Sequence, residues 1–188
     1  MKKHNKKHSK KNKGFSLIEL LIVVAIILII AAIAIPNLLR SRIAANEASA
    51  VASNRTLVTA EITYSTTYVA DGFANLDALG YGTGVNACPA TGPTNKASCL
   101  IDNSLQVAVD ATHTKSGYFF LATPLPAGSG SGSGTVATDF VIGAVPGSAN
   151  ASGVRSFCAM PDGVVRYKNP GDTTPVATDA TCTAYTPL

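Results

Sequence analysis

The most informative stretch of the chain reads KGFSLIELLIVVAIILIIAAIAIP, residues 13 to 36. From Phe15 to Ile35 it holds 21 residues, of which only Ser16 and Glu19 are polar. A helix of about 20 apolar residues spans a bilayer. A secretory signal peptide would have a shorter apolar region followed by a small-residue cleavage site. The run therefore predicts a retained membrane anchor.

Positive charge is concentrated ahead of this anchor. The chain has 188 residues and a formal net charge of +4, yet seven of its fifteen basic residues precede Gly14. Without those lysines, eight basic residues face eleven acidic ones. The cluster favours a cytoplasmic N-terminus by the positive-inside rule. A nucleic-acid-binding arm is the alternative for a lysine block, but we infer no specific nucleic acid because the block leads straight into the apolar run.

Glu19 is the unusual residue of the anchor. Carboxylates within membrane helices are costly, and by default they are candidates for a function. Glu19 lies four residues past Phe15, which is about 6 Å along a helix that rises 1.5 Å per residue. A position near the membrane surface is therefore the alternative explanation.

Helical periodicity continues beyond the anchor and predicts one helix from about residue 15 to 69. Pro36 should bend it, because proline cannot donate a hydrogen bond to the carbonyl of Ala32. Asp71-Gly72 should end the pattern. The face expected to pack on a core comprises Ala44, Ala48, Val51, Val58, Ile62 and Val69, flanked by Leu57, Tyr64 and Tyr68.

The remainder of the chain is predicted to form a β-rich domain. Pro161-Asp162-Gly163 is a hairpin signal between the last two of its expected strands. The segment GSGSGSG, residues 128–134, has a flexible linker composition and predicts a mobile hairpin loop. Short helices are expected within 75–80 and 100–109, and strands at 117–124, 138–146, 154–160 and 164–168. The predicted class is α+β, with the long helix packed on a C-terminal antiparallel sheet of about four strands.

Four cysteines, Cys88, Cys99, Cys158 and Cys182, all follow the anchor. Zinc binding is disfavoured, because no C-x₂₋₄-C pair exists and His113 is the only histidine after the leader. Disulfides are favoured, which implies an oxidising compartment. Of three possible connectivities, nearest-neighbour pairing closes loops of about 12 and about 25 residues, worth roughly 3 and 3.5 kcal/mol. We expect that pairing.

The sequence supplies little for an enzyme. His113 stands alone in the region after the anchor, and no nucleophile motif is recognisable. Three acidic residues, Asp162, Asp172 and Asp179, could supply oxygens to calcium but match no calcium-loop motif. We therefore predict no catalytic residues, no cofactor and no metal site.

The order Gly14, Phe15 and then Glu19 at the fifth residue after the glycine resembles the N-terminus of bacterial type IV prepilins of the type IVa kind. AAIAIPNLLRSR (31–42) extends the resemblance through Pro36. Further along, KSGYFF (115–120), RSFCAMPDGVVRYK (155–168) and a late cysteine are similar to pilins of deltaproteobacteria and acidobacteria.

The resemblance implies that prepilin peptidase cuts between Gly14 and Phe15 and that Phe15 is then N-methylated. Glu19 of one subunit would pair with the new Phe15 amine of a neighbour, and this pairing penalises wrong axial registers. Family members commonly carry glycine where this chain has Leu28, a better helix former. Any loss of helix should therefore be confined near Pro36.

The implied function is that of the major pilin of an extracellular type IV pilus, a homopolymer for adhesion and twitching motility. A minor or competence pilin and a type II secretion pseudopilin are the alternatives. The pilus assembly machinery is the further expected partner. The chain would first lie in the inner membrane and later in the filament. The expected segments are a cleaved leader (1–14), a filament-core helix (15–36), its amphipathic continuation (37–70) and a globular head (71–188).

Overall fold

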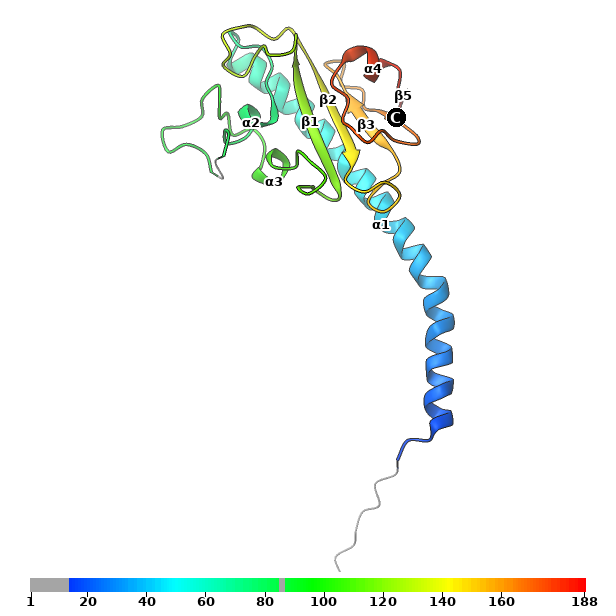
Figure 1. Cartoon of the computed structure of the whole chain (residues 1–188). Coiled ribbons are helices and arrows are strands. Elements are labelled where there is room, and N and C mark those ends of the chain that lie inside the picture. Colours follow the sequence, from blue (N-terminus) through cyan, green and yellow to red (C-terminus); the bar gives the residue numbers. More distant parts are fainter. Residues whose placement is uncertain (1–13, 85–86) are drawn as a thin grey trace, which may run out of the picture. The chain divides into compact units, whose positions relative to one another are not determined.

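The computed structural model describes residues 14–84 and 87–188, so the lysine leader lies outside the described residues (Figure 1). Contacts divide the chain into two compact units. The first ends at Leu39 and the second runs from Arg40 to Leu188.

Helix α1, Leu17–Thr67, has 51 residues. No glycine occurs between Phe15 and Asp71, and the first unit is rich in leucine, isoleucine and alanine. Alanine and leucine are the strongest helix formers and isoleucine is only moderately weaker, so this composition favours a continuous helix. The helix continues through Pro36. The bend expected there stays a prediction.

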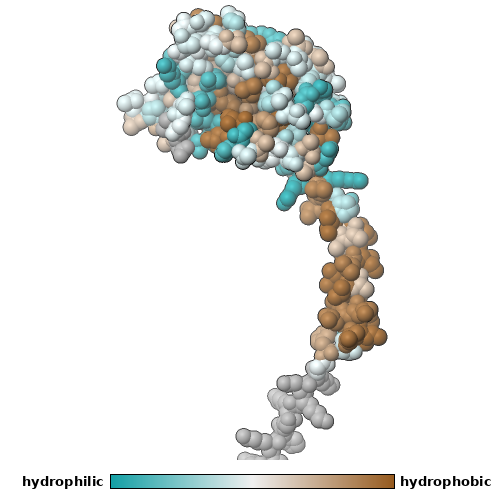
Figure 2. Space-filling model, viewed as in Figure 1, coloured by the Kyte–Doolittle hydropathy of each residue, from teal (hydrophilic) through white to brown (hydrophobic). Residues whose placement is uncertain are grey.

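Apolar side chains cover the helical part of the first unit, as Figure 2 shows in brown. Leu17 is 80% exposed and Ile33 is 66% exposed. This segment is the one described helix that is long and apolar enough to cross a membrane. Such a surface is unfavourable in water and needs lipid or protein to cover it.

In the second unit, α1 packs on the sheet with a different face from the one predicted. Val51, Val58, Leu57 and Tyr64 are buried, as expected. Ala44, Ala48, Ile62 and Val69 are exposed, and Val69 lies beyond the end of the helix, so their predicted burial is wrong. The buried face is centred instead on three polar residues spaced by seven: Glu47, Asn54 and Glu61.

The helix ends where the chain turns at Gly72. This residue has φ +79°, and a Cβ there would lie 1.9 Å from the carbonyl oxygen of Ala137. Glycine is required because the left-handed conformation and the close backbone contact both exclude a side chain. The predicted stop at Asp71-Gly72 is therefore correct within a few residues.

The sheet is antiparallel throughout, with its strands in chain order from β1 to β5. It has five strands, one more than predicted, because the C-terminal tail pairs with β4. Their bounds are β1 Tyr118–Leu125, β2 Asp139–Pro146, β3 Ser156–Ala159, β4 Arg166–Lys168 and β5 Thr186–Pro187. The α+β class and the helix-on-sheet arrangement are confirmed. The core that joins helix and sheet includes Leu57, Tyr64, Tyr118, Phe120, Ile142 and Phe157.

Three short helices complete the head: α2 Leu76–Leu79, α3 Asn103–Gln106 and α4 Asp179–Thr183. The first two fall inside the predicted segments, and each begins at a polar cap. Asn75 Oδ1 accepts from the amide of Ala78, and Asp102 Oδ1 accepts from the amide of Leu105. Such caps satisfy amides that a short helix leaves free.

The glycine-serine segment 128–134 packs against the rest of the head, contrary to the expectation of a mobile loop. Ser131 Oγ accepts from the amide of Asn75, and the amide of Gly132 donates to Asp71 Oδ1. Ser129 and Gly130 are buried. The glycines allow this close packing because a Cβ at Gly130 would lie 1.9 Å from the carbonyl oxygen of Phe73.

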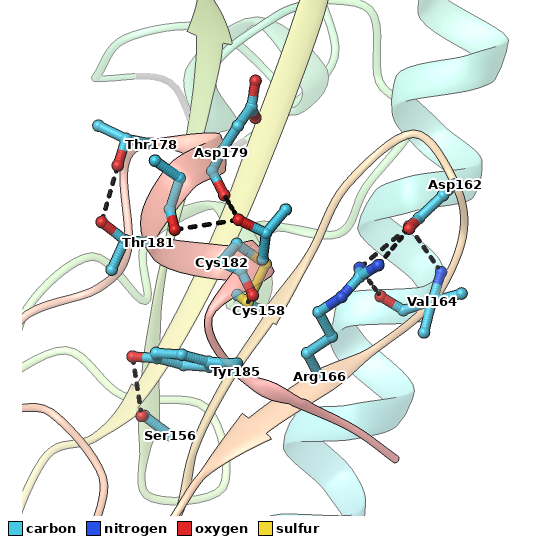
Figure 3. The surroundings of a disulfide bond; sticks show 12 residues. Ser156, Cys158, Asp162, Val164, Arg166, Thr178, Asp179, Thr181, Cys182 and Tyr185 are labelled. Atoms are coloured by element: carbon cyan, nitrogen blue, oxygen red, sulfur yellow. Dashed lines mark hydrogen bonds and ion pairs between the residues drawn. A yellow bond between two sulfur atoms is a disulfide. The ribbon is translucent and has the colours of Figure 1, made fainter.

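Two disulfides join the pairs expected from the sequence, Cys88–Cys99 and Cys158–Cys182. The second links β3 to α4 and so fastens the C-terminal tail, as Figure 3 shows. Around it lies a small second core formed by Val141, Met160, Val176 and Tyr185.

Candidate assembly site

The N-terminal segment presents its sequence-predicted site residues in accessible positions. Gly14 and Phe15 precede the first helical residue, and Phe15 is 83% exposed. A Cβ added to Gly14 would meet nothing within 4 Å. The peptide bond between these residues is therefore accessible to another protein. No contact within the chain itself requires glycine at position 14.

Glu19 lies in the first turn of α1, where its Oε2 accepts a hydrogen bond from the amide of Ser16 at 3.1 Å. Ser16 precedes the first helical residue, and Glu19 is the third residue of the helix. This is half of a capping box, in which a glutamate satisfies an amide that the helix leaves free. A carboxylate there also complements the helix dipole. Sequence reasoning missed this local role, although the S-x-x-E pattern at 16–19 signals it.

Pro36 does not lie near Glu19. It lies inside α1, seventeen residues further along, which is about 26 Å by helix rise. The Phe15 amine that would pair with Glu19 arises only after cleavage. The predicted charge pair therefore stays a prediction.

In the second unit, Glu47 is the buried charge with the most hydrogen-bond partners. Its Oε1 accepts from the amides of Val154 and Arg155, and its Oε2 lies 2.7 Å from Arg155 Nη2. Burial would raise the pKa of Glu47, but the Val154 amide and the Arg155 guanidinium outweigh it and leave that pKa below its usual value. The Arg155 guanidinium also lies over the rings of Phe157 and Tyr167. This group fastens the start of the packed part of α1 to β3.

Glu61 is buried in a different environment. Its Oε2 accepts from the amide of Ala74 at 2.9 Å, and its Oε1 has no partner among the described residues. Burial raises the pKa of Glu61 to about 8, against the smaller opposing effect of the Ala74 amide. In the folded second unit, burial therefore favours the protonated form of this carboxyl at neutral pH.

The three candidate calcium ligands do not form one site, because Asp162 and Asp179 line one pocket and Asp172 does not. Asp162 pairs with Arg166, while Asp172 pairs with Lys168 and accepts from the Tyr185 hydroxyl. Among residues 14–84 and 87–188, no cluster of three histidine, cysteine or acidic side chains could hold a metal. On the surface, His113 contacts the Asp110 carboxylate and the Thr112 hydroxyl.

Comparison with known proteins agrees with this geometry. Residues 9–35 match the prokaryotic N-terminal methylation motif. The chain therefore combines this motif with a long helix packed on an antiparallel sheet, which is a pilin-like α+β fold.

Among individual proteins, the chain is similar to the type IV wide pilus major component PilA4 of Thermus thermophilus. The two are 69% identical over 35 residues, which cover 19% of this chain and 27% of the relative. The chain therefore aligns with about a quarter of that relative's length. A Thermus protein does not support the deltaproteobacterial or acidobacterial affinity expected from the sequence. No solved structure matches the chain significantly.

Proposed function

We propose that this chain is the precursor of the major pilin of a type IV pilus, a filament for adhesion and twitching motility. The observation that carries the proposal is the apolar helix of the first unit, whose large side chains are all exposed in the single chain. Lipid can cover this surface before assembly, and the same surface of neighbouring copies can cover it afterwards. The motif match at residues 9–35 supports this interpretation.

The proposed processing follows from the accessible N-terminal segment. Prepilin peptidase removes residues 1–14 by cutting between Gly14 and Phe15, and Phe15 is then N-methylated. The new amine carries a positive charge, and Glu19 of a neighbouring copy is its partner. Residues 15–36 form the filament core, with Pro36 at its end, 37–70 the amphipathic continuation, and 71–188 the head. The pilus machinery moves the subunit from the inner membrane to the surface.

Purified surface filaments test this function directly. Filaments are sheared from cells that produce the chain, imaged, and identified by mass spectrometry. We expect this chain to be the main protein, beginning at a singly methylated Phe15. Filaments built mainly of another protein, with this chain present in trace, would favour a minor pilin. Loss of protein secretion without loss of surface filaments, on deletion of the gene, would favour a pseudopilin.

A further inference from the structure

Unpaired charges of opposite sign lie at the two ends of the second unit. Among its described residues, the cations without an ion pair are Arg40, Arg42, Arg55 and Lys96. Arg40 and Arg42 are exposed at the start of this unit. The acidic residues without an ion pair in the described part of this unit are Glu61, Asp71, Asp77, Asp139 and Asp179, of which only Asp139 and Asp179 share a pocket. These last two belong to β2 and α4.

These two aspartates line an open pocket of about 470 Å³ whose apolar wall includes Phe73, Met160 and Pro161. Asp179 Oδ1 is buried and has no hydrogen-bond partner within the described part of the chain. The Asp179 side chain points away from the Cys158–Cys182 disulfide in Figure 3. Burial first and the Asp139 carboxylate second raise the pKa of Asp179, so a cation placed here would relieve a repulsion.

The pocket suits an arginine in shape and in charge. A guanidinium can bind carboxylates with two parallel hydrogen bonds. The methylene stem of an arginine covers apolar surface while its head stays polar. Phe73 and Met160 offer that surface beside Asp139 and Asp179.

The two ends cannot meet within one copy. From Arg42 to Thr67 the helix extends about 37 Å by its rise per residue. The pocket lies beyond that far end, because the amide of Ala137, two residues before Asp139, donates to the carbonyl of Asp71 at 2.8 Å. A contact between these ends therefore joins different copies.

We propose that Arg40 and Arg42 of one copy dock in the Asp139–Asp179 pocket of the next copy, as an axial contact between heads. The inference rests on the proposed function and names the surfaces that it uses. The contact is heterologous, since each copy offers a different patch at each end, and heterologous contacts that do not close produce open helical filaments. It leaves one cationic and one acidic patch free at the filament ends for further copies.

A charge-swap experiment in cells that assemble the wild-type chain tests this contact. Arg40→Glu with Arg42→Glu, and separately Asp139→Lys with Asp179→Lys, should each lower the yield of sheared filaments at least about tenfold, since like charges facing across a contact cost several kcal/mol. The four changes combined should restore roughly half of the wild-type yield or more, because opposite charges again face each other. Arg55→Glu, an exposed cation further along the same helix, is the matched control and should leave the yield close to that of the wild type.

Failure of the inference is distinguishable from failure of the proposed function. If the wild-type chain forms no filament, the proposed function is wrong. If it forms filaments, and either double variant assembles normally or the combined variant stays defective, the axial contact is wrong. The amount of cleaved, disulfide-bonded subunit in the membrane shows that the variants fold.

Crosslinking gives the geometry independently. A chain carrying Arg42→Cys and Asp139→Cys, oxidised within intact filaments, should give a ladder of multimers under non-reducing conditions, because every copy donates and accepts one link. Either cysteine alone should give no ladder. A single dimer band from the doubly substituted chain, or no crosslink at all, would overturn the head-to-tail contact.

Discussion

At the residue scale, the polar centre of the buried face of α1 is the least expected feature. Glu47 is satisfied by the Arg155 guanidinium and two amides, whereas Glu61 has one amide for two oxygens. Asn54 is fully buried, and neither its Oδ1 nor its Nδ2 has a partner among the described residues. Buried polar groups that lack partners destabilise a fold. This face therefore holds one polar side chain that is fully hydrogen-bonded, Glu47, and two that are not, Asn54 and Glu61.

Glu61 should make the head less stable at alkaline pH. Its pKa is raised from 4.5 to about 8, so the folded state holds a proton that the unfolded state releases. The stability associated with this proton is present below about pH 4.5 and is lost as pH rises through about 8. Glu61→Gln should therefore be more favourable at pH 9 than at pH 5. The difference in free energy of unfolding between the variant and the wild type should rise by on the order of 1 kcal/mol or more between these two pH values. Denaturant unfolding of the full chain in detergent measures this difference.

Glu47→Gln is the matched control, with the opposite sign. The pKa of Glu47 lies below its ordinary value, so its stabilising effect is present above pH 4.5 and is lost as pH falls. This variant should be destabilised at pH 7 by roughly 1 to 2 kcal/mol, because it leaves the Arg155 charge without its partner, while water screens part of that charge on a side chain that is 37% exposed. A Glu61→Gln variant that loses stability at pH 9 as Glu47→Gln does would show that Glu61 is ionised and needed there.

At the scale of elements, the sequence pattern predicted those features that depend on residues close together along the chain. The strands around Phe120 and Phe157 and the helix stop at Gly72 follow from composition and turn signals. The orientation of α1 does not, because Glu47 is buried by partners more than a hundred residues away. Nor does β5, which has two residues and exists only through pairing with β4. The contacts of Gly132 with Asp71 are likewise tertiary, so the composition of its loop could not reveal them.

The disulfide pairing gives an element-scale prediction. Cys158 lies in β3 and Cys182 in α4, so their bond fixes the tail that supplies β5. Peptide mapping of the secreted protein without reduction should recover Cys88–Cys99 and Cys158–Cys182. Removing the second bond should free the tail and cost about 3.5 kcal/mol by loop entropy. A Cys99–Cys158 peptide, or free thiols, would contradict the pairing.

The anchor helix gives a second prediction at the scale of elements. Leu28 stands where the resembling pilins carry glycine, and leucine favours helix by almost 1 kcal/mol per residue over glycine. Regular helix should therefore persist through Leu28 in an assembled filament, with any irregular backbone near Pro36, which cannot donate to Ala32. A Leu28→Gly variant, imaged alongside at the same resolution, should extend the irregular segment toward residue 28. A wild-type filament map with extended chain already beginning at Leu28 would show that neighbouring copies override this preference.

At the scale of the whole molecule, the sequence predicts which residues form the candidate site, but a single chain does not show how they act. The short spacing of Gly14, Phe15 and Glu19 specifies the segment, and each residue lies where an accessible N-terminus requires. The partners proposed for these residues are a protease and another copy, neither of which is part of one chain. Glu19 therefore has two candidate roles, a local cap on Ser16 and a charge for a neighbouring amine.

Substitutions at Gly14 and Glu19 should fail in different ways and separate these roles. Gly14→Val should leave uncut precursor in the membrane and give no filaments, because the side chain obstructs the protease while meeting nothing in the chain itself. Glu19→Ala should be cut normally, five residues from the bond, yet assemble poorly. It removes the cap and the charge together, whereas Glu19→Gln keeps a capping side chain and removes only the charge.

If charge pairing explains the residue, Glu19→Gln should assemble as poorly as Glu19→Ala, and both should accumulate as mature subunits in the membrane. Precursor and mature band ratios, with a count of sheared filaments, measure both steps in one set of strains. Helix content of the purified subunits controls for the cap, whose loss should fray only the first turn and cost about 1 kcal/mol. Wild-type filament numbers from Glu19→Gln would mean that charge pairing with an amine on the next copy does not explain Glu19. Its hydrogen bond to the Ser16 amide in the first turn of the helix would then be the better explanation.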